Sequence, residues 1–385
     1  MKKILAVLSV CALLLSVAFA QSEDDGSAIW AYQRYQEAMA GSEIDPVITY
    51  AKMAYERALE EWGDAKKETG LIASNYGNAL LRGGKSKEAI GVFRRCEENL
   101  VKFQPETIID LAICQLRQGQ IHRSLDDKEN SERAFLRMVE SLSAVEEPVS
   151  IEVSTLLGEA YLGLAQVSFP EKVRLRRQEQ DFSSRTEKSK RYLDLAYPHL
   201  VAAYGENHHS LGTLHYLYGL IHESARDWKK AMDAYNRSYD IRKNLFGEEA
   251  PASKAAYGRY RFAGSFAGGA EGRDKIIRTK GDKCFYRKVE DEKITSCLKY
   301  RKIPEFPTTK VYSGEFGFVL VSYTISETGQ TRDVEIIASW PGGEFDHVAK
   351  SSIERWKFTP PVNEAGEVKA LTDIEALFNF KLVHR

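Results

Sequence analysis

Two kinds of hydrophobic pattern divide this chain. From residue 28 to about residue 262, apolar positions recur every three to four residues, which is the spacing of amphipathic helices. Near the C-terminus the pattern becomes an alternation, so that Val319, Val321, Tyr323 and Ile325 would share one face of a strand. The sequence therefore predicts an all-helical region followed by a small domain that contains a sheet.

The terminal stretch predicts the order β-β-α-β. A glycine-containing turn at 327–330 would join the first strand to a return strand at 332–338. A helical period follows, and the proline pair at 360–361 is expected to end that helix. A last strand would run over 374–382. The positions that would form one helix face are Phe345, Val348, Ala349, Ile353 and Trp356. The prediction is a small α+β domain with one helix across one face of its sheet.

The helical region repeats a phrase of small and aromatic residues. The phrase beginning Asn75-Tyr76-Gly77 and continuing to Ala89 and Phe93 returns around Tyr218-Gly219, and partial copies lie between them. It resembles the tetratricopeptide (TPR) repeat, in which small residues let paired helices approach and an aromatic side chain fills the gap. The resemblance implies an all-α TPR solenoid of four or five repeats over residues 28–262.

A stack of such repeats implies a concave groove lined by the first helix of each pair. Asparagine, arginine and tyrosine side chains there would hold peptide segments of a partner protein. The alternative is that these are ordinary solvent-facing helix residues. The groove candidates are Asn75, Asn78, Arg82, Glu159 and Tyr216.

The residues from 303 to 385 resemble the C-terminal domain of the TonB family. The resemblance rests on spaced positions through the stretch and on a Phe-Pro pair where that family usually has Tyr-Pro. The matching positions are Phe306-Pro307, Gly317-Phe318-Val319, Gly329, Ser339, Phe345-Asp346, Ala349, Trp356-Lys357-Phe358, Pro360 and Gly366. The resemblance implies a sheet edge that grips a segment of an outer-membrane transporter.

By this resemblance the last strand is the candidate partner-binding edge. The alternative is that the linker or a second copy of the chain covers that edge, which would make a homodimer. The candidate edge residues are Glu375, Leu377, Asn379 and Lys381.

Residues 1–20 have the pattern of a signal peptide. Lys2 and Lys3 precede a short apolar run, and Ala18-Phe19-Ala20 offers small residues for cleavage. We expect cleavage after Ala20 and export to the periplasm. If the segment is not cleaved, it would anchor the protein in the inner membrane.

Residues 263–302 are interpreted as a glycine-containing linker followed by a basic neck. Within it, residues 273–302 hold eleven basic against five acidic residues. Export to an oxidising compartment makes disulfides available, so Cys284 and Cys297 either form a bridge or remain as two thiols. Cys96 and Cys114 are interpreted as buried free thiols in helices.

Composition and motifs favour a binding protein over an enzyme. The formal net charge is −1, which gives no overall field to attract nucleic acid. Neither a phosphate-binding glycine loop nor a nucleophile elbow is found. His215 and His222 share a helix face but lack a third ligand, so we expect neither a metal nor a cofactor.

Two hypotheses follow. In the first, the chain is a TonB-like periplasmic protein that binds outer-membrane transporters in transmembrane transport, with the repeats as a scaffold. In the second, it is a periplasmic TPR adaptor with no role in energy transduction. The second has support because the first apolar run lacks the histidine expected of a TonB anchor, and because helical repeats stand where that family has a proline-rich spacer. The whole chain has only 11 prolines.

Overall fold

Helices occupy the described chain as far as Gly264, and strands dominate after it. The structure is a computed structural model, and the chain divides into two compact units, Met1–Ala144 and Val145–Arg385. It describes residues 23–145, 149–170, 179–267, 275–278, 283–289, 292–307 and 317–380.

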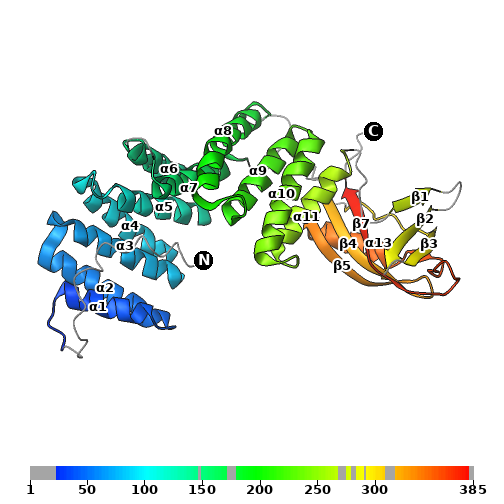
Figure 1. Ribbon diagram of the computed structural model, residues 1–385, viewed down its shortest axis with the longest axis horizontal. Coiled ribbons are helices and arrows are strands. Elements are labelled where there is room, and N and C mark those ends of the chain that lie inside the picture. The colour runs from blue at the N-terminus through cyan, green and yellow to red at the C-terminus, as the bar shows by residue number, and fades with distance from the viewer. Residues whose placement is uncertain are drawn as a thin grey trace. The chain divides into compact units, whose positions relative to one another are not determined.

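The first unit consists of helix hairpins joined by short connections (Figure 1). Its alanine, glycine and aromatic positions are buried between the paired helices, as the helical period predicts. Short 3-10 turns follow α2 and α4. The helices are α1 (Ala28–Met39), α2 (Ile44–Trp62), α3 (Lys67–Arg82), α4 (Ser86–Leu100), α5 (Ile108–Ser124) and α6 (Lys128–Leu142).

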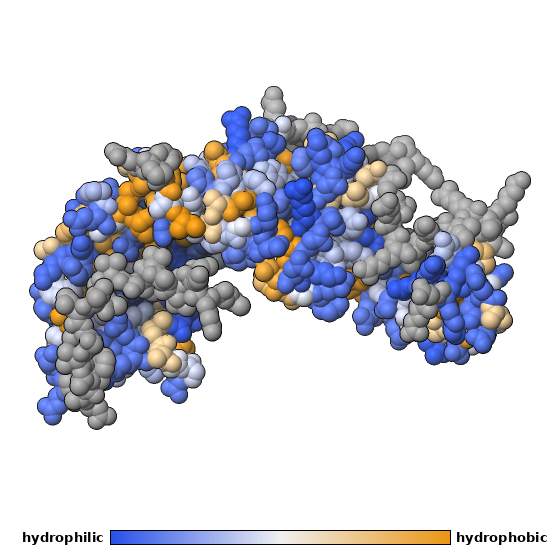
Figure 2. All heavy atoms as spheres, viewed as in Figure 1, coloured by the Kyte–Doolittle hydropathy of each residue, from blue (hydrophilic) through white to orange (hydrophobic). Residues whose placement is uncertain are grey.

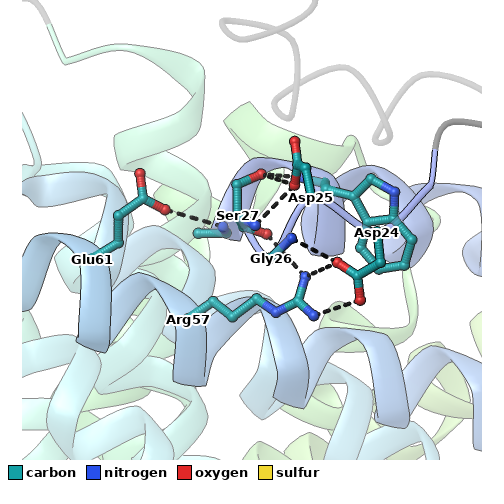
Figure 3. A network of polar contacts seen from close by, with 8 residues as sticks. Asp24, Asp25, Gly26, Ser27, Arg57 and Glu61 are labelled. Carbon is teal, nitrogen blue, oxygen red and sulfur yellow. Dashed lines mark hydrogen bonds and ion pairs between the residues drawn. The ribbon is translucent and has the colours of Figure 1, made fainter.

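A polar network fixes the start of α1 (Figure 3). The Ser27 hydroxyl accepts a hydrogen bond from the Trp30 backbone N–H at 3.1 Å, which caps the helix. Arg57 of α2 donates to both carboxylate oxygens of Asp24 at 2.7 Å, and this contact lowers the pKa of Asp24. The residues just before α1 are therefore held against α2.

The second unit continues the hairpins and adds one further helix. The pairs α7–α8 and α9–α10 pack as in the first unit, and α11 follows α10 without a helical partner after it (Figure 1). The helices are α7 (Ile151–Ser168), α8 (Glu179–Tyr204), α9 (His209–Ser224), α10 (Trp228–Phe246) and α11 (Pro251–Gly264).

A glycine in the first helix of several pairs packs against a ring from the second helix. A Cβ placed on Gly77 would lie 2.7 Å from Phe93, and one on Gly119 would lie 2.6 Å from Phe135. Gly219 lies against Tyr235 in the same way. This is the close approach that the repeated phrase predicts, and the TPR-type helix-pair architecture is confirmed.

The terminal domain contains two antiparallel sheets. One has the strand order β1-β2-β3-β6 and the other β5-β4-β7. The helix α13 (Glu344–Ile353) lies between β5 and β6 in the chain. The strands are β1 (Lys275–Arg278), β2 (Lys283–Val289), β3 (Glu292–Tyr300), β4 (Gly317–Ile325), β5 (Thr331–Trp340), β6 (Lys357–Phe358) and β7 (Leu371–Phe380).

The core of the terminal domain lies between α13 and one face of the β5-β4-β7 sheet. The four alternating β4 residues 319, 321, 323 and 325 all point into this core, as predicted. Phe345, Ala349 and Ile353 of α13 cover them. The predicted α+β fold is confirmed, although α13 ends at Ile353, well before the proline pair, because β6 intervenes.

Strands β1, β2 and β3 lie within the range 263–302, where the sequence predicts a linker and neck. The Cys284–Cys297 bridge, one of the two alternatives, joins opposite residues of β2 and β3. The expectation of free thiols at Cys96 and Cys114 is wrong in the structure, because α4 and α5 bring them together in a disulfide. Figure 2 shows hydrophilic residues over most of the visible face and apolar residues gathered locally between helices.

Candidate functional site

Strand β7 forms one side of its sheet. β4 is the central strand, and it pairs with β5 on one side and with β7 on the other. Within the described part of the chain, no further strand pairs with the other side of β7. The backbone N–H and C=O groups along that side are the kind that an added strand can pair with.

The side chains of β7 alternate between two packed layers. Ile374, Phe378 and Phe380 enter the core beneath α13. Glu375, Leu377 and Asn379 point to the opposite face, which α11 covers. Three of the predicted edge residues therefore make contacts within the chain, whereas the fourth, Lys381, lies outside the described residues.

Glu375 is held by two residues of α11. The Tyr257 hydroxyl lies 3.0 Å from each carboxylate oxygen of Glu375. Arg261 forms an ion pair with the same carboxylate, and the Glu375 side chain is only 15% exposed. Arg261 also donates to the Tyr257 hydroxyl at 2.9 Å. The three side chains thus form one closed polar cluster between helix and strand.

The contacting residues of α11 and of β7 are spaced by similar distances along the helix and along the strand. Tyr257 and Ser265 are eight helical residues apart, or about 12 Å along a helix axis. Their partners Glu375 and Asn379 are four strand residues apart, or about 13 Å. The Asn379 side chain donates to the Ser265 hydroxyl at 3.2 Å. The helix therefore runs along β7 in the same direction as the strand.

Arg259 links this interface to the helical repeats. It is 5% exposed, and its guanidinium lies 2.7 Å from the Glu223 carboxylate of α9. The same guanidinium stacks over Trp340 at 4.7 Å and over Phe318 at 5.5 Å. The Tyr235 hydroxyl also donates to Glu223 at 2.6 Å. A single buried cation thus contacts residues of both the repeats and the sheet.

A cavity of about 300 Å³ is lined by residues from the first half of α11 and from the β5-β4-β7 sheet. The helical wall includes Tyr239, Lys254 and Tyr257, and the sheet wall includes Ser322 and Glu375. The cavity therefore adjoins the polar cluster around Glu375.

The groove candidates of the first unit lie on α3 beside α1. The Asn75 amide donates to the Tyr32 hydroxyl at 3.4 Å, and Asn78 is half-buried. Arg82 is exposed, with a guanidinium nitrogen 2.6 Å from the sulfur of Met39. Their role in binding a peptide stays a prediction.

The groove candidates of the second unit pack against neighbouring helices. Glu159 of α7 accepts a hydrogen bond from the Ser210 hydroxyl of α9 at 2.6 Å. Tyr216 packs against Tyr235 with ring centroids 5.5 Å apart, and the Arg242 guanidinium lies 4.7 Å from its ring. Both side chains therefore have structural contacts, and their role in partner binding stays a prediction.

The residues of α11 that meet the sheet are absent from the sequence-based candidates. A signal for them exists, because Tyr257-Gly258 repeats the Tyr-Gly pairs at 76–77 and 218–219. The phrase marks a helix that should pack on a ring. It does not say that the ring comes from a strand.

Comparisons with known proteins agree with the terminal fold. Residues 302–382 match the family model described as Gram-negative bacterial TonB protein C-terminal. No curated protein matches the chain. The match supports an envelope-associated role in protein interaction.

Solved structures of low identity resemble the chain in part. The crystal structure of BtubC (BKLC) from P. vanneervenii has 13% identity and a TM-score of 0.44, covering 60% of this chain and 86% of that one. A putative kinesin light chain from Podosopora anserina, with nearly identical TPR-like repeats, has 8% identity and a TM-score of 0.38, covering 57% of this chain and 94% of that one.

Membrane-spanning helices and metal-binding clusters are both absent from the described residues. None of the described helices combines the length and the apolar character needed to cross a membrane. Across the same residues, no group of three or more histidine, cysteine, aspartate or glutamate side chains is arranged to hold a metal ion.

Proposed function

We propose that this protein is a periplasmic adaptor whose β7 edge takes up an extended segment of an outer-membrane transporter. The observation that supports this most is the position of β7 as an outer strand in a domain that matches the TonB C-terminal model. Main-chain hydrogen bonds would supply affinity, as in other cases of strand addition.

The contacts of α11 limit the direction from which a partner segment can bind β7. Because α11 and α13 cover the two faces of the sheet, a partner reaches β7 from the side. Glu375 and Leu377 then act by holding α11 in place, and the partner pairs with the strand backbone. The helical repeats offer a second binding surface that stays joined to the sheet through Arg259.

Photo-crosslinking in the native envelope tests the proposal. A photoreactive amino acid is placed at Thr372 or Asn379, two exposed positions on β7. The matched control is Arg332, an exposed position on β5 at the opposite side of the same sheet. We expect adducts with transporter segments from both β7 positions and a much lower yield from β5.

Equal yields from the two sides, or transporter adducts from neither, would contradict the proposal. If only other envelope proteins are trapped from β7, the adaptor without energy transduction becomes the better account. The helix hairpins that precede the sheet support this second function, because stacked repeats commonly bind proteins.

A further inference from the structure

The outer face of β2 and β3 carries lysines and a disulfide. Ile294 and Ser296 of β3 are buried on the inner face, so the alternate residues of the strand lie on the outer face. The Cys284–Cys297 bridge lies on this outer face. We call Lys288, Lys293 and Lys299 on this face the lysine face; Lys288 and Lys299 are exposed and Lys293 is half-buried.

Two of these lysines face each other across the β2–β3 pair. Lys288 and Lys293 are direct cross-strand partners in the β2–β3 register. Like charges directly opposite one another destabilise a sheet. Lys293 packs over the Tyr286 ring at 4.7 Å, and in the described part of the chain Lys288 and Lys299 have no ion-pair partner. An anionic ligand would remove the repulsion.

Among the described residues beside the lysine face, the acidic side chain of Glu292 points elsewhere. Glu292 opens β3 on the inner face and pairs with Lys369 at 2.5 Å. It therefore does not neutralise the lysine face. Figure 2 shows mostly hydrophilic residues over the part of the terminal domain around β3.

The residue types indicate which anion fits. Arginine suits the bidentate recognition of carboxylates, whereas lysine is a compact, hydrated point charge that suits diffuse attraction to phosphates. The lysine face contains no arginine. Tyr286 lies on the lysine face beside Lys293 and is half-buried, and a tyrosine ring next to cations is typical of contact with a lipid interface.

We propose that the lysine face binds the phosphate headgroups of an anionic membrane surface. Each lysine near such a surface contributes favourably to binding, and the contribution falls with rising salt. This surface is separate from the β7 edge, so the proposal does not rest on the transporter-binding function.

Vesicle co-sedimentation of the full chain tests this directly. Phosphatidylglycerol vesicles are the probe, and phosphatidylcholine vesicles control for apolar binding by any other segment. The test variant is Lys288→Gln, Lys293→Gln and Lys299→Gln combined. We expect the wild type to prefer phosphatidylglycerol and the variant to bind it on the order of 100-fold more weakly.

A second triple variant controls for net charge. Lys85→Gln, Lys87→Gln and Lys350→Gln remove three exposed lysines elsewhere, so both variants carry the same formal charge. This control is expected to bind as the wild type does. Inorganic phosphate is expected to compete no better than chloride at equal ionic strength, because a lipid surface presents many headgroups at once.

Three results would overturn the proposal. The wild type could bind both lipids equally, or the two triple variants could lose binding equally. Strong competition by inorganic phosphate would instead indicate a site for the free anion. Thermal unfolding of both variants checks that neither has lost its fold.

Discussion

Gly258 of α11 lies against Phe318 of β4. A Cβ on Gly258 would be 3.1 Å from the Phe318 ring and closer still to the side chain of Ala338. Gly77 meets Phe93 and Gly219 meets Tyr235 in the same manner, but those rings come from the second helix of each pair. The terminal sheet therefore occupies the place that a second helix would take beside α11, and the repeats and the sheet share one continuous packing.

Replacing Gly258 with alanine should destabilise the protein. The added methyl group would overlap Ala338 and crowd Phe318, and overpacking of this kind typically costs about 1–3 kcal/mol. Urea denaturation measures the change in the free energy of unfolding. Gly91→Ala is the matched control, because nothing lies within 4 Å of a Cβ at that exposed helical position. The control should be neutral or slightly stabilising, and equal losses in both variants would refute the packing described.

Removing the buried cation of Arg259 should lower the free energy of unfolding by more than the Gly258→Ala change does. Arg259→Met leaves the Glu223 carboxylate, whose side chain is 13% exposed, without its ion-pair partner. Breaking a buried pair from one side typically costs about 3–5 kcal/mol. Adding Glu223→Leu removes the orphaned charge and should restore most of the loss. Calorimetric Tm values for the single and double variants test this, and a double variant less stable than Arg259→Met would contradict the assignment.

Stability should fall as the pH falls below neutrality. Burial lowers the pKa of His215 to about 4. Between pH 6.5 and 4 the imidazole therefore stays neutral in the folded protein, whereas in the unfolded chain it takes up a proton near pH 6.5. The stability that the neutral, buried imidazole contributes is complete above pH 6.5 and is lost progressively as the pH falls toward 4. Between pH 7.5 and 5 this one residue should cost on the order of 2 kcal/mol.

Denaturation of His215→Gln at the two pH values measures that contribution. The variant should lose less stability than the wild type between pH 7.5 and 5. His347→Gln, which replaces an exposed histidine on α13, is the control and should keep the wild-type pH dependence. An unchanged pH dependence in His215→Gln would show that the imidazole is not buried as described.

The sequence predicts those parts of the fold whose pattern is regular. The alternation from Val319 to Ile325 identifies β4 because every second residue enters one core. Strands β2 and β3 are missed because charged residues interrupt their alternation and only Ile294 and Ser296 of β3 are fully buried. The residues of β2 and β3 are therefore interpreted from the sequence as part of a basic neck.

The candidate site is predicted only in part for a related reason. The β7 edge follows from the order of the elements, but the partners of its outer face do not. Tyr257 and Glu375 are 118 residues apart in the chain, and no local pattern connects them. The Tyr-Gly phrase at 257–258 indicates a helix that packs closely, whereas the identity of its partner is a tertiary property.

A cysteine pair across α11 and β7 tests whether the last helix of the repeats is docked on the terminal sheet. Ser265→Cys and Asn379→Cys replace two side chains that share a hydrogen bond. The control combines Ser265→Cys with Thr372→Cys, about 23 Å further along the same strand. Near-complete bridging of the first pair is expected under mild oxidation, mapped by mass spectrometry, with little bridging in the second pair. Absence of the first bridge, or equal bridging in both pairs, would contradict this docking.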